Sequence, residues 1–252
     1  MANWQDPRSA AERTGGVNPT VTVGVPSATR DAGLRSYMLS VYNYMASGVL
    51  LTGIIALLFA PYAGQVLLSA SGRGMSGLGW IITLSPLAIV FAMSFGMTRM
   101  RTSTLQLLFW AFAGLMGLSM STLFLAYTGT SIAQTFFATA AAYLGLSLYG
   151  YTTKRDLSGM GTFLIMGVVG LLVAMLINMF LQSSAMALAI SAIGVLLFAG
   201  LTAYDTQRIK SLYFYVQGTE MAGKTVIMGA LQLYLDFINM FQFLLMFMGN
   251  RR

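Results

Sequence analysis

The sequence predicts an all-α, polytopic membrane protein with seven transmembrane helices. Hydrophobic residues make up 57% of the 252 residues, charged residues only 8%, and the mean hydropathy is +0.73. Soluble domains carry about 25% charged residues, so the composition excludes an ordinary soluble domain. Apolar segments long enough to cross a bilayer, which takes about 20 residues, follow one another along the chain. We expect them at residues 37–60, 79–97, 104–127, 132–151, 159–181, 184–204 and 225–248.

The first 36 residues are polar and are interrupted by Pro7, Pro19 and Pro26. No apolar segment of the kind found in a signal peptide follows the first charges. Low hydrophobicity without helical periodicity is typical of disorder. We therefore expect residues 1–36 to form a disordered cytoplasmic tail and residues 37–252 to form the transmembrane domain.

The connections between the segments predict how neighbouring helices pair. Very short linkers, TGTS at 128–131 and QSS at 182–184, join two pairs of segments, which must therefore be antiparallel hairpins. Two segments fit a spanning helix less well: residues 79–97 contain Pro86, and residues 225–248 contain several polar side chains. If the last segment only re-enters the membrane, the C terminus returns to the side from which that segment starts.

The distribution of Lys and Arg predicts the orientation, because cytoplasmic loops are enriched in both residues. Nine basic residues collect on one side of the seven segments and three on the other. The N terminus should be cytoplasmic and, after seven crossings, the C terminus periplasmic. The formal charge of +7 is therefore interpreted as a topology signal, and a nucleic-acid partner is not expected.

Cysteine and histidine are absent, which limits the chemistry that the chain can perform. Thiolate and imidazole metal sites, Ser-His-Asp triads and Cys-His nucleophiles are all excluded. An intramembrane hydrolase built on two aspartates, Asp205 and Asp236, is an alternative, but neither of them lies in a GxGD-type motif. We therefore expect a protein that is not an enzyme and has no cofactor.

Asp236 lies near the middle of the last apolar segment, and a charge at that depth costs about 2.5–3.5 kcal/mol. It should therefore face protein or water, and Asp205, at the end of the preceding segment, is the best candidate for its partner. For Asp205 the alternative is a surface ion pair with Arg208, three residues later. Both interpretations of Asp205 remain open from the sequence.

Two carboxyl groups that meet in a poorly solvated place cannot both ionise easily, so they share one proton. Raising the pH removes that proton, and the two charges would then separate the helices or attract a cation. Calcium suits a bare pair of oxygen ligands, but it prefers six to eight, so the site would be weak and transient. The neutral donors expected nearby are Tyr204, Tyr234, Asn239, Asn43 and Tyr42.

Arg99 and Arg101 follow the second segment at its cytoplasmic end and could interact with the pair or close its exit. The alternative for both is ordinary positive-inside anchoring, which fits Arg101 better than Arg99.

Four stretches resemble the bacterial branch of the transmembrane Bax inhibitor motif family. They are LRSYMLSVYNYMASGVLLTG at 34–53, LGLSLYGYTTKRDLSGMGTFL at 144–164, AYDTQRIK at 203–210 and LQLYLDFINMFQFLL at 231–245. The resemblance covers about residues 35–249, that is, everything except the tail. LYLDFINMF is the most specific of these motifs.

The resemblance implies a fold in which the seventh helix lies at the centre of a bundle formed by the other six. It also implies that Asp205 and Asp236 match a pH-sensing aspartyl dyad, that Arg99 matches an arginine latching to it, and that the protein is a pH-sensitive calcium leak channel. The lysine-rich C-terminal tail of eukaryotic members is missing here, which favours a bacterial inner membrane. The alternative function is binding and regulation of a membrane-anchored AAA protease, for which the N-terminal tail would supply the contact.

Overall fold

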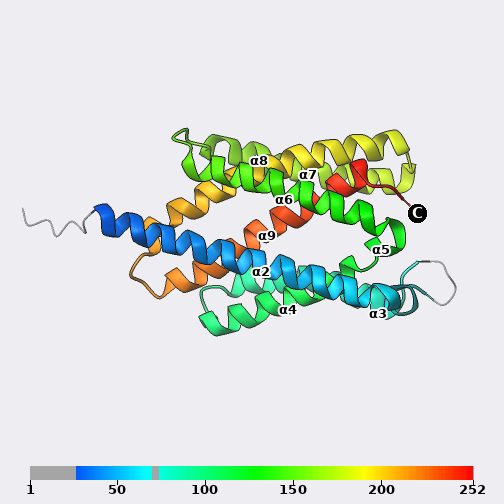
Figure 1. Ribbon diagram of the computed structural model, residues 1–252, viewed down its shortest axis with the longest axis horizontal. Coiled ribbons are helices and arrows are strands. Elements are labelled where there is room, and N and C mark those ends of the chain that lie inside the picture. Colours follow the sequence, from blue (N-terminus) through cyan, green and yellow to red (C-terminus); the bar gives the residue numbers. More distant parts are fainter. Residues whose placement is uncertain (1–26, 70–73, 252) are drawn as a thin grey trace, which may run out of the picture. The chain divides into compact units, whose positions relative to one another are not determined.

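The structure is a computed structural model that describes residues 27–69 and 74–251, with side chains from residue 31 (Figure 1). The chain divides into two compact units, Met1–Ser36 and Tyr37–Arg252. Residues 1–26, where most of the tail was predicted, lie outside the described residues. Residues 27–36 are helical instead of disordered, since the first helix begins directly after Pro26 and meets no further proline until Pro61.

The described residues form helices and no named strand, which confirms the predicted all-α class. The helices are α2 (Ser27–Leu67), α3 (Gly77–Gly96), α4 (Thr102–Met120), α5 (Leu123–Ala126), α6 (Gly129–Thr152), α7 (Ser158–Leu181), α8 (Ser184–Val216) and α9 (Met221–Met248). Seven spans in the described part of the chain are long and apolar enough to cross a membrane, with α4 and α5 together forming the third. The protein is therefore a multi-pass membrane protein.

The third span, predicted as one helix over 104–127, is broken between α4 and α5. At the break, Ser121 and Thr122 turn their hydroxyl groups back onto the carbonyls of Leu118 (2.6 Å) and Ser119 (2.9 Å). Hydroxyl groups that bond to the backbone in this way compete with regular helical hydrogen bonding. Pro86, by contrast, leaves α3 continuous, since prolines are tolerated in membrane helices where neighbouring groups satisfy the backbone.

Helix α8 continues twelve residues beyond the predicted end at residue 204. Hydropathy marks only the apolar part of a helix, so the polar stretch from Asp205 to Val216 was not included in the predicted segment. The helix ends at Val216, and its C-cap Gln217 is followed by Gly218, whose φ of 77° is readily adopted by glycine.

Helix α9 is the most buried of the seven spans, with 56% of its apolar window buried against 39% or less for the others. It packs against α8, α6 and α4, and Figure 1 shows it running between α6 and α8 on one side and α4 on the other. Thr52 of α2 also reaches α9, through a 2.7 Å hydrogen bond to Tyr234. A position at the centre of all six other helices stays a prediction.

Contacts at the two ends of α9 indicate that it crosses the whole bundle. In its first turns, Lys224 Nζ donates to Thr98 O (3.2 Å) in the α3–α4 connection. Beyond its last turn, Asn250 N donates to Ser131 Oγ (2.9 Å) at the start of α6. The third span, α4 with α5, connects the region of Thr98 with the region of Ser131. Helix α9 contacts both regions, so it covers a comparable distance and does not turn back halfway.

Helices α6 and α8 cross at very close range beside Asp205. A Cβ atom added to Gly150 of α6 would lie 2.3 Å from the carbonyl oxygen of Ala203. Small residues allow this approach, and in a membrane such van der Waals packing drives helix association. The close crossing therefore fixes the position of α8 against α6 just before Asp205.

Candidate functional site

Asp205 of α8 and Asp236 of α9 lie against each other where these two helices pack. Each side chain is only 2% exposed, and the two carboxyl groups are close enough to act on each other electrostatically. The structure therefore brings together the two acids that the sequence singled out inside the membrane.

Gln232 is the neutral partner of this pair. Its Nε2 donates to Asp205 Oδ2 at 3.0 Å. Because Gln232 lies four residues before Asp236, both side chains project from the same face of α9. Unlike the two carboxyl groups, the Gln232 side chain is exposed. Gln232 therefore reaches from the exposed surface of the bundle to the buried pair.

The described part of the chain gives the pair no buried positive partner. None of the Lys and Arg residues with described side chains is buried. Arg208 acts on Asp205 through its charge, but Asp205 is buried and accepts a hydrogen bond from Gln232, so it is not simply half of a surface ion pair with Arg208. Within the described residues, Asp236 Oδ2 is buried and has no hydrogen-bond partner. Such an unsatisfied oxygen costs about 1–3 kcal/mol unless it binds a proton, water or a cation.

Helix α6 contributes hydroxyl groups close to the pair. Tyr143, which is within electrostatic reach of both aspartates, donates to the carbonyl oxygen of Leu233 at 3.3 Å. One turn further along α6, Ser147 hydrogen-bonds to Tyr42 (3.2 Å) and to Thr206 (3.1 Å), the residue that follows Asp205. A short series of hydroxyl groups therefore runs from α2 across α6 to α8 beside the acids.

The other predicted polar neighbours are engaged elsewhere or lie on the surface. Tyr234 is fully buried and hydrogen-bonds to Thr52, whereas Asn239 donates to Leu235 O of its own helix (2.8 Å). Tyr204 packs on Gly161, and Asn43 is exposed. These four residues support the helices around the pair, and the structure gives none of them a hydrogen bond to either carboxyl group in the part that it describes.

Arg99 and Arg101 lie in the short connection between α3 and α4, and both side chains are exposed. Within residues 31–69 and 74–251, the groups that act on the two carboxyls are Gln232, Tyr143 and Arg208, and Arg99 is not one of them. The arginine latch therefore stays a prediction. The predicted protease contact also stays a prediction, because most of the tail lies outside the described residues.

Sequence reasoning missed two residues of the site, Gln232 and Tyr143. Gln232 had a detectable signal, since it is a polar residue one helical turn from Asp236 in a mostly apolar segment. Tyr143 had no such signal, because a tyrosine in an apolar segment fits an interfacial or packing role equally well.

The donor set fits a weakly held hard cation. The two carboxyl groups supply oxygens, one of them unsatisfied, whereas Gln232 faces Asp205 with its amide nitrogen. The described residues contain no cluster of three or more acidic, histidine or cysteine ligands. Calcium prefers six to eight oxygens, so protein atoms alone would hold it only loosely, with water completing the shell.

Comparison with known proteins agrees with this architecture. The family profile described as "Inhibitor of apoptosis-promoting Bax1" matches residues 34–252. An uncharacterized protein of Rickettsia prowazekii is 48% identical over 233 residues, which cover 92% of this chain and 97% of the relative. The inner membrane protein YbhL of Escherichia coli K12 is 44% identical over 223 residues, covering 88% of this chain and 94% of YbhL. The chain therefore belongs to the Bax inhibitor family of membrane proteins.

Proposed function

We propose that this protein is a pH-regulated calcium leak of a bacterial inner membrane, controlled by the proton that Asp205 and Asp236 share. One observation carries the proposal: two carboxyl groups are buried between α8 and α9, close enough to act on each other electrostatically, without a buried cation beside them in the described residues. An intramembrane acid pair is costly to keep, which makes a role in a proton or ion pathway the default explanation.

The shared proton controls the contact between the two helices. With one proton, the pair carries a single negative charge, and the carboxyl groups hold α8 and α9 together through their hydrogen bond. When the pH rises and the proton leaves, two negative charges face each other at short range in a medium of low dielectric. Repulsion then separates the carboxyl groups or draws in a cation, so calcium flux should rise with pH.

Calcium would enter as cargo and not as a resident cofactor. The ionised carboxyl groups would bind it briefly, with the unsatisfied Asp236 Oδ2 as a ready ligand. Because the protein supplies few oxygens, the ion is not trapped, as conduction requires. In this scheme the protein needs no cofactor and performs no covalent catalysis.

The location and orientation are part of the proposal. The Escherichia coli relatives are named inner membrane proteins, which supports the inner membrane for this chain. The excess of Lys and Arg in one set of loops supports a cytoplasmic N terminus and a periplasmic C terminus.

The test is calcium flux into liposomes that contain the purified protein and an enclosed calcium indicator, measured over a pH series. The wild-type flux should rise with pH. Asp236→Asn keeps the shape and can donate to Asp205, but it cannot ionise, so its flux should vary little with pH. Asp205→Asn should behave in the same way. Asp156→Asn, which removes an exposed loop acid, is the matched control and should retain the wild-type profile.

Two results would contradict the proposal. One is wild-type flux that does not differ from protein-free liposomes at any pH. The other is an unchanged pH profile in folded Asp236→Asn and Asp205→Asn proteins.

A further inference from the structure

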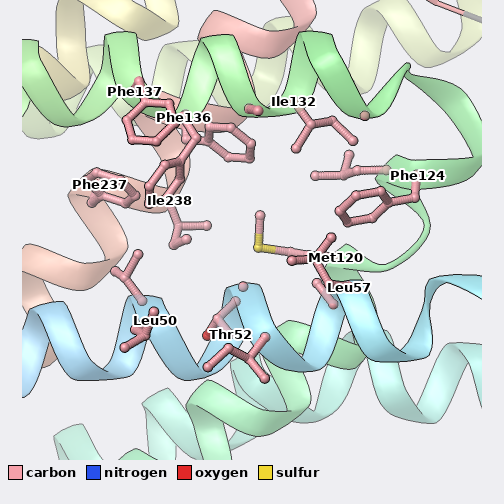
Figure 2. Close-up of a pocket in the computed structure, with 18 residues that line it drawn as sticks. Leu50, Thr52, Leu57, Met120, Phe124, Ile132, Phe136, Phe137, Phe237 and Ile238 are labelled. Atoms are coloured by element: carbon pink, nitrogen blue, oxygen red, sulfur yellow. The ribbon is translucent and has the colours of Figure 1, made fainter.

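A cavity of about 310 Å³ lies between α2 and α6, with α9 behind it and the α4–α5 break at one end (Figure 2). Of the 18 residues that line it, only Thr52 has a polar side chain. The Thr52 hydroxyl is already engaged with Ala113 O (2.8 Å) and Tyr234 OH (2.7 Å). The cavity therefore offers a ligand only carbon surface, and such cavities do not hold water.

The cavity opens sideways from the bundle. Its walls combine buried residues such as Val49 and Ile238 with exposed ones such as Leu50 and Phe137, which are 64% and 70% exposed. In a spanning protein, exposed Leu and Phe in the middle of a helix face lipid hydrocarbon. The cavity is therefore continuous with the bilayer, and we call it the α2–α6 crevice.

The depth of the α2–α6 crevice matches one leaflet. Along α6 its lining extends from Gly129, at the start of the helix, to Phe137. These eight steps correspond to about 12 Å of helix, close to the roughly 15 Å that is half of the hydrocarbon thickness. The crevice thus begins at one membrane surface, the one beside Asn250, and ends near the middle of the membrane.

We propose that the α2–α6 crevice binds one acyl chain of a phospholipid from the leaflet on the C-terminal side of the protein. If the crevice were empty, its wall side chains would lose van der Waals contacts, and an acyl chain of a neighbouring lipid can supply these contacts. A transmembrane helix of a partner is about 10–12 Å across with its side chains and is too wide for this volume. The bound chain would touch Phe237, the residue that follows Asp236, but acyl-chain binding does not depend on the proposed leak.

The experiment uses the full protein in nanodiscs of phosphatidylcholine, part of which carries a photoreactive diazirine near the end of one acyl chain. After illumination, mass spectrometry maps the labelled residues. Val49 and Ile238 are buried but line the crevice, whereas Met240 is also buried and does not line it. Labelling of Val49 and Ile238 should exceed that of Met240 at least severalfold.

A filling variant makes the test specific. Ala133→Trp places a large side chain in the crevice from an exposed position on α6, and it should reduce labelling of Val49 and Ile238 severalfold. Ala142→Trp, on the same helix and exposed but outside the lining, should leave the labelling unchanged. Added phosphatidylcholine should also raise the melting temperature of detergent-solubilised wild-type protein more than that of Ala133→Trp.

Three results would overturn the proposal. The first is labelling of Val49 and Ile238 no stronger than labelling of Met240. The second is a folded Ala133→Trp protein with unchanged labelling. The third is a native mass spectrum that shows a bound molecule other than phospholipid together with unlabelled crevice residues. If Ala133→Trp does not fold, the comparison within the wild-type protein still decides the question.

Discussion

Removing the amide of Gln232 should increase calcium flux. Gln232 Nε2 donates to Asp205 Oδ2 at 3.0 Å from an exposed position, so it both stabilises the negative charge on the pair and covers it. Gln232→Leu keeps a side chain of similar size but removes the donor, which separates the hydrogen bond from steric effects. Gln232→Ala removes both.

The size of the effect follows from the hydrogen bond. A hydrogen bond to a charged group contributes about 1.5–3 kcal/mol, and each 1.4 kcal/mol corresponds to a factor of ten. If this bond forms only while the α8–α9 contact is closed, its loss shifts the equilibrium toward the open state roughly 10- to 100-fold. The increase should be largest at acidic pH, where most wild-type molecules are closed.

The assay is liposome calcium flux at several pH values, with equal protein incorporation confirmed for each variant. Gln242→Ala, which removes a glutamine ten residues further along α9, is the control and should match the wild type. Folded Gln232→Leu protein with wild-type flux at every pH would refute the reasoning, since the hydrogen bond would then have no part in closing the site.

Two further predictions concern the scaffold. Gly150→Ala should lower the stability of the solubilised protein by about 1–3 kcal/mol, because its Cβ would lie 2.3 Å from Ala203 O. The control is Gly145→Ala on the same helix, whose Cβ would meet nothing within 4 Å, so this variant should be neutral or stabilising. Similar melting temperatures for the two variants would contradict the close crossing. Outside the spans, hydrogen bonds from Ser158, first from its hydroxyl and then from its backbone N–H, hold the pKa of Asp156 below its ordinary value of 3.8. These hydrogen bonds therefore stabilise the start of α7 at pH values above 3.8. This stabilisation is lost as the pH falls through the lowered pKa. In an NMR titration Ser158→Ala should raise the Asp156 pKa toward 3.8, and an unchanged titration would show that the hydroxyl does not act on the carboxyl group.

Much of the fold was predictable because membrane helices are selected by a strong and local signal. About 20 apolar residues identify a span, and seven such segments were found where the structure has them. Helix ends were less predictable: α8 continues through Asp205 to Val216 because backbone hydrogen bonding does not require an apolar sequence. The break at Ser121 depends on hydroxyl groups that also occur in unbroken helices.

The candidate site was predictable in its acids and not in their neighbours. Asp236 and Asp205 stand out because buried acids are costly, and their order in the chain placed them on adjacent helices. Which neutral groups reach them depends on helix rotation and side-chain rotamers, so Gln232 is a partner while Asn239, also a polar residue of α9, bonds to its own helix. The α2–α6 crevice depends on the shapes of side chains from several helices, which periodicity does not encode.

The neutral character of Gln232 suits a proton-controlled pair better than an arginine would. An arginine in contact with both carboxyl groups would stabilise their doubly ionised form, and the pair would then need no proton at neutral pH. An amide donates one hydrogen bond without a charge, so the second negative charge remains unfavourable and a proton or a cation must neutralise it. Arg208 does not change this, because its exposed charge is screened by its surroundings. The proposed leak therefore depends on a site in which the proton competes only with the permeating ion.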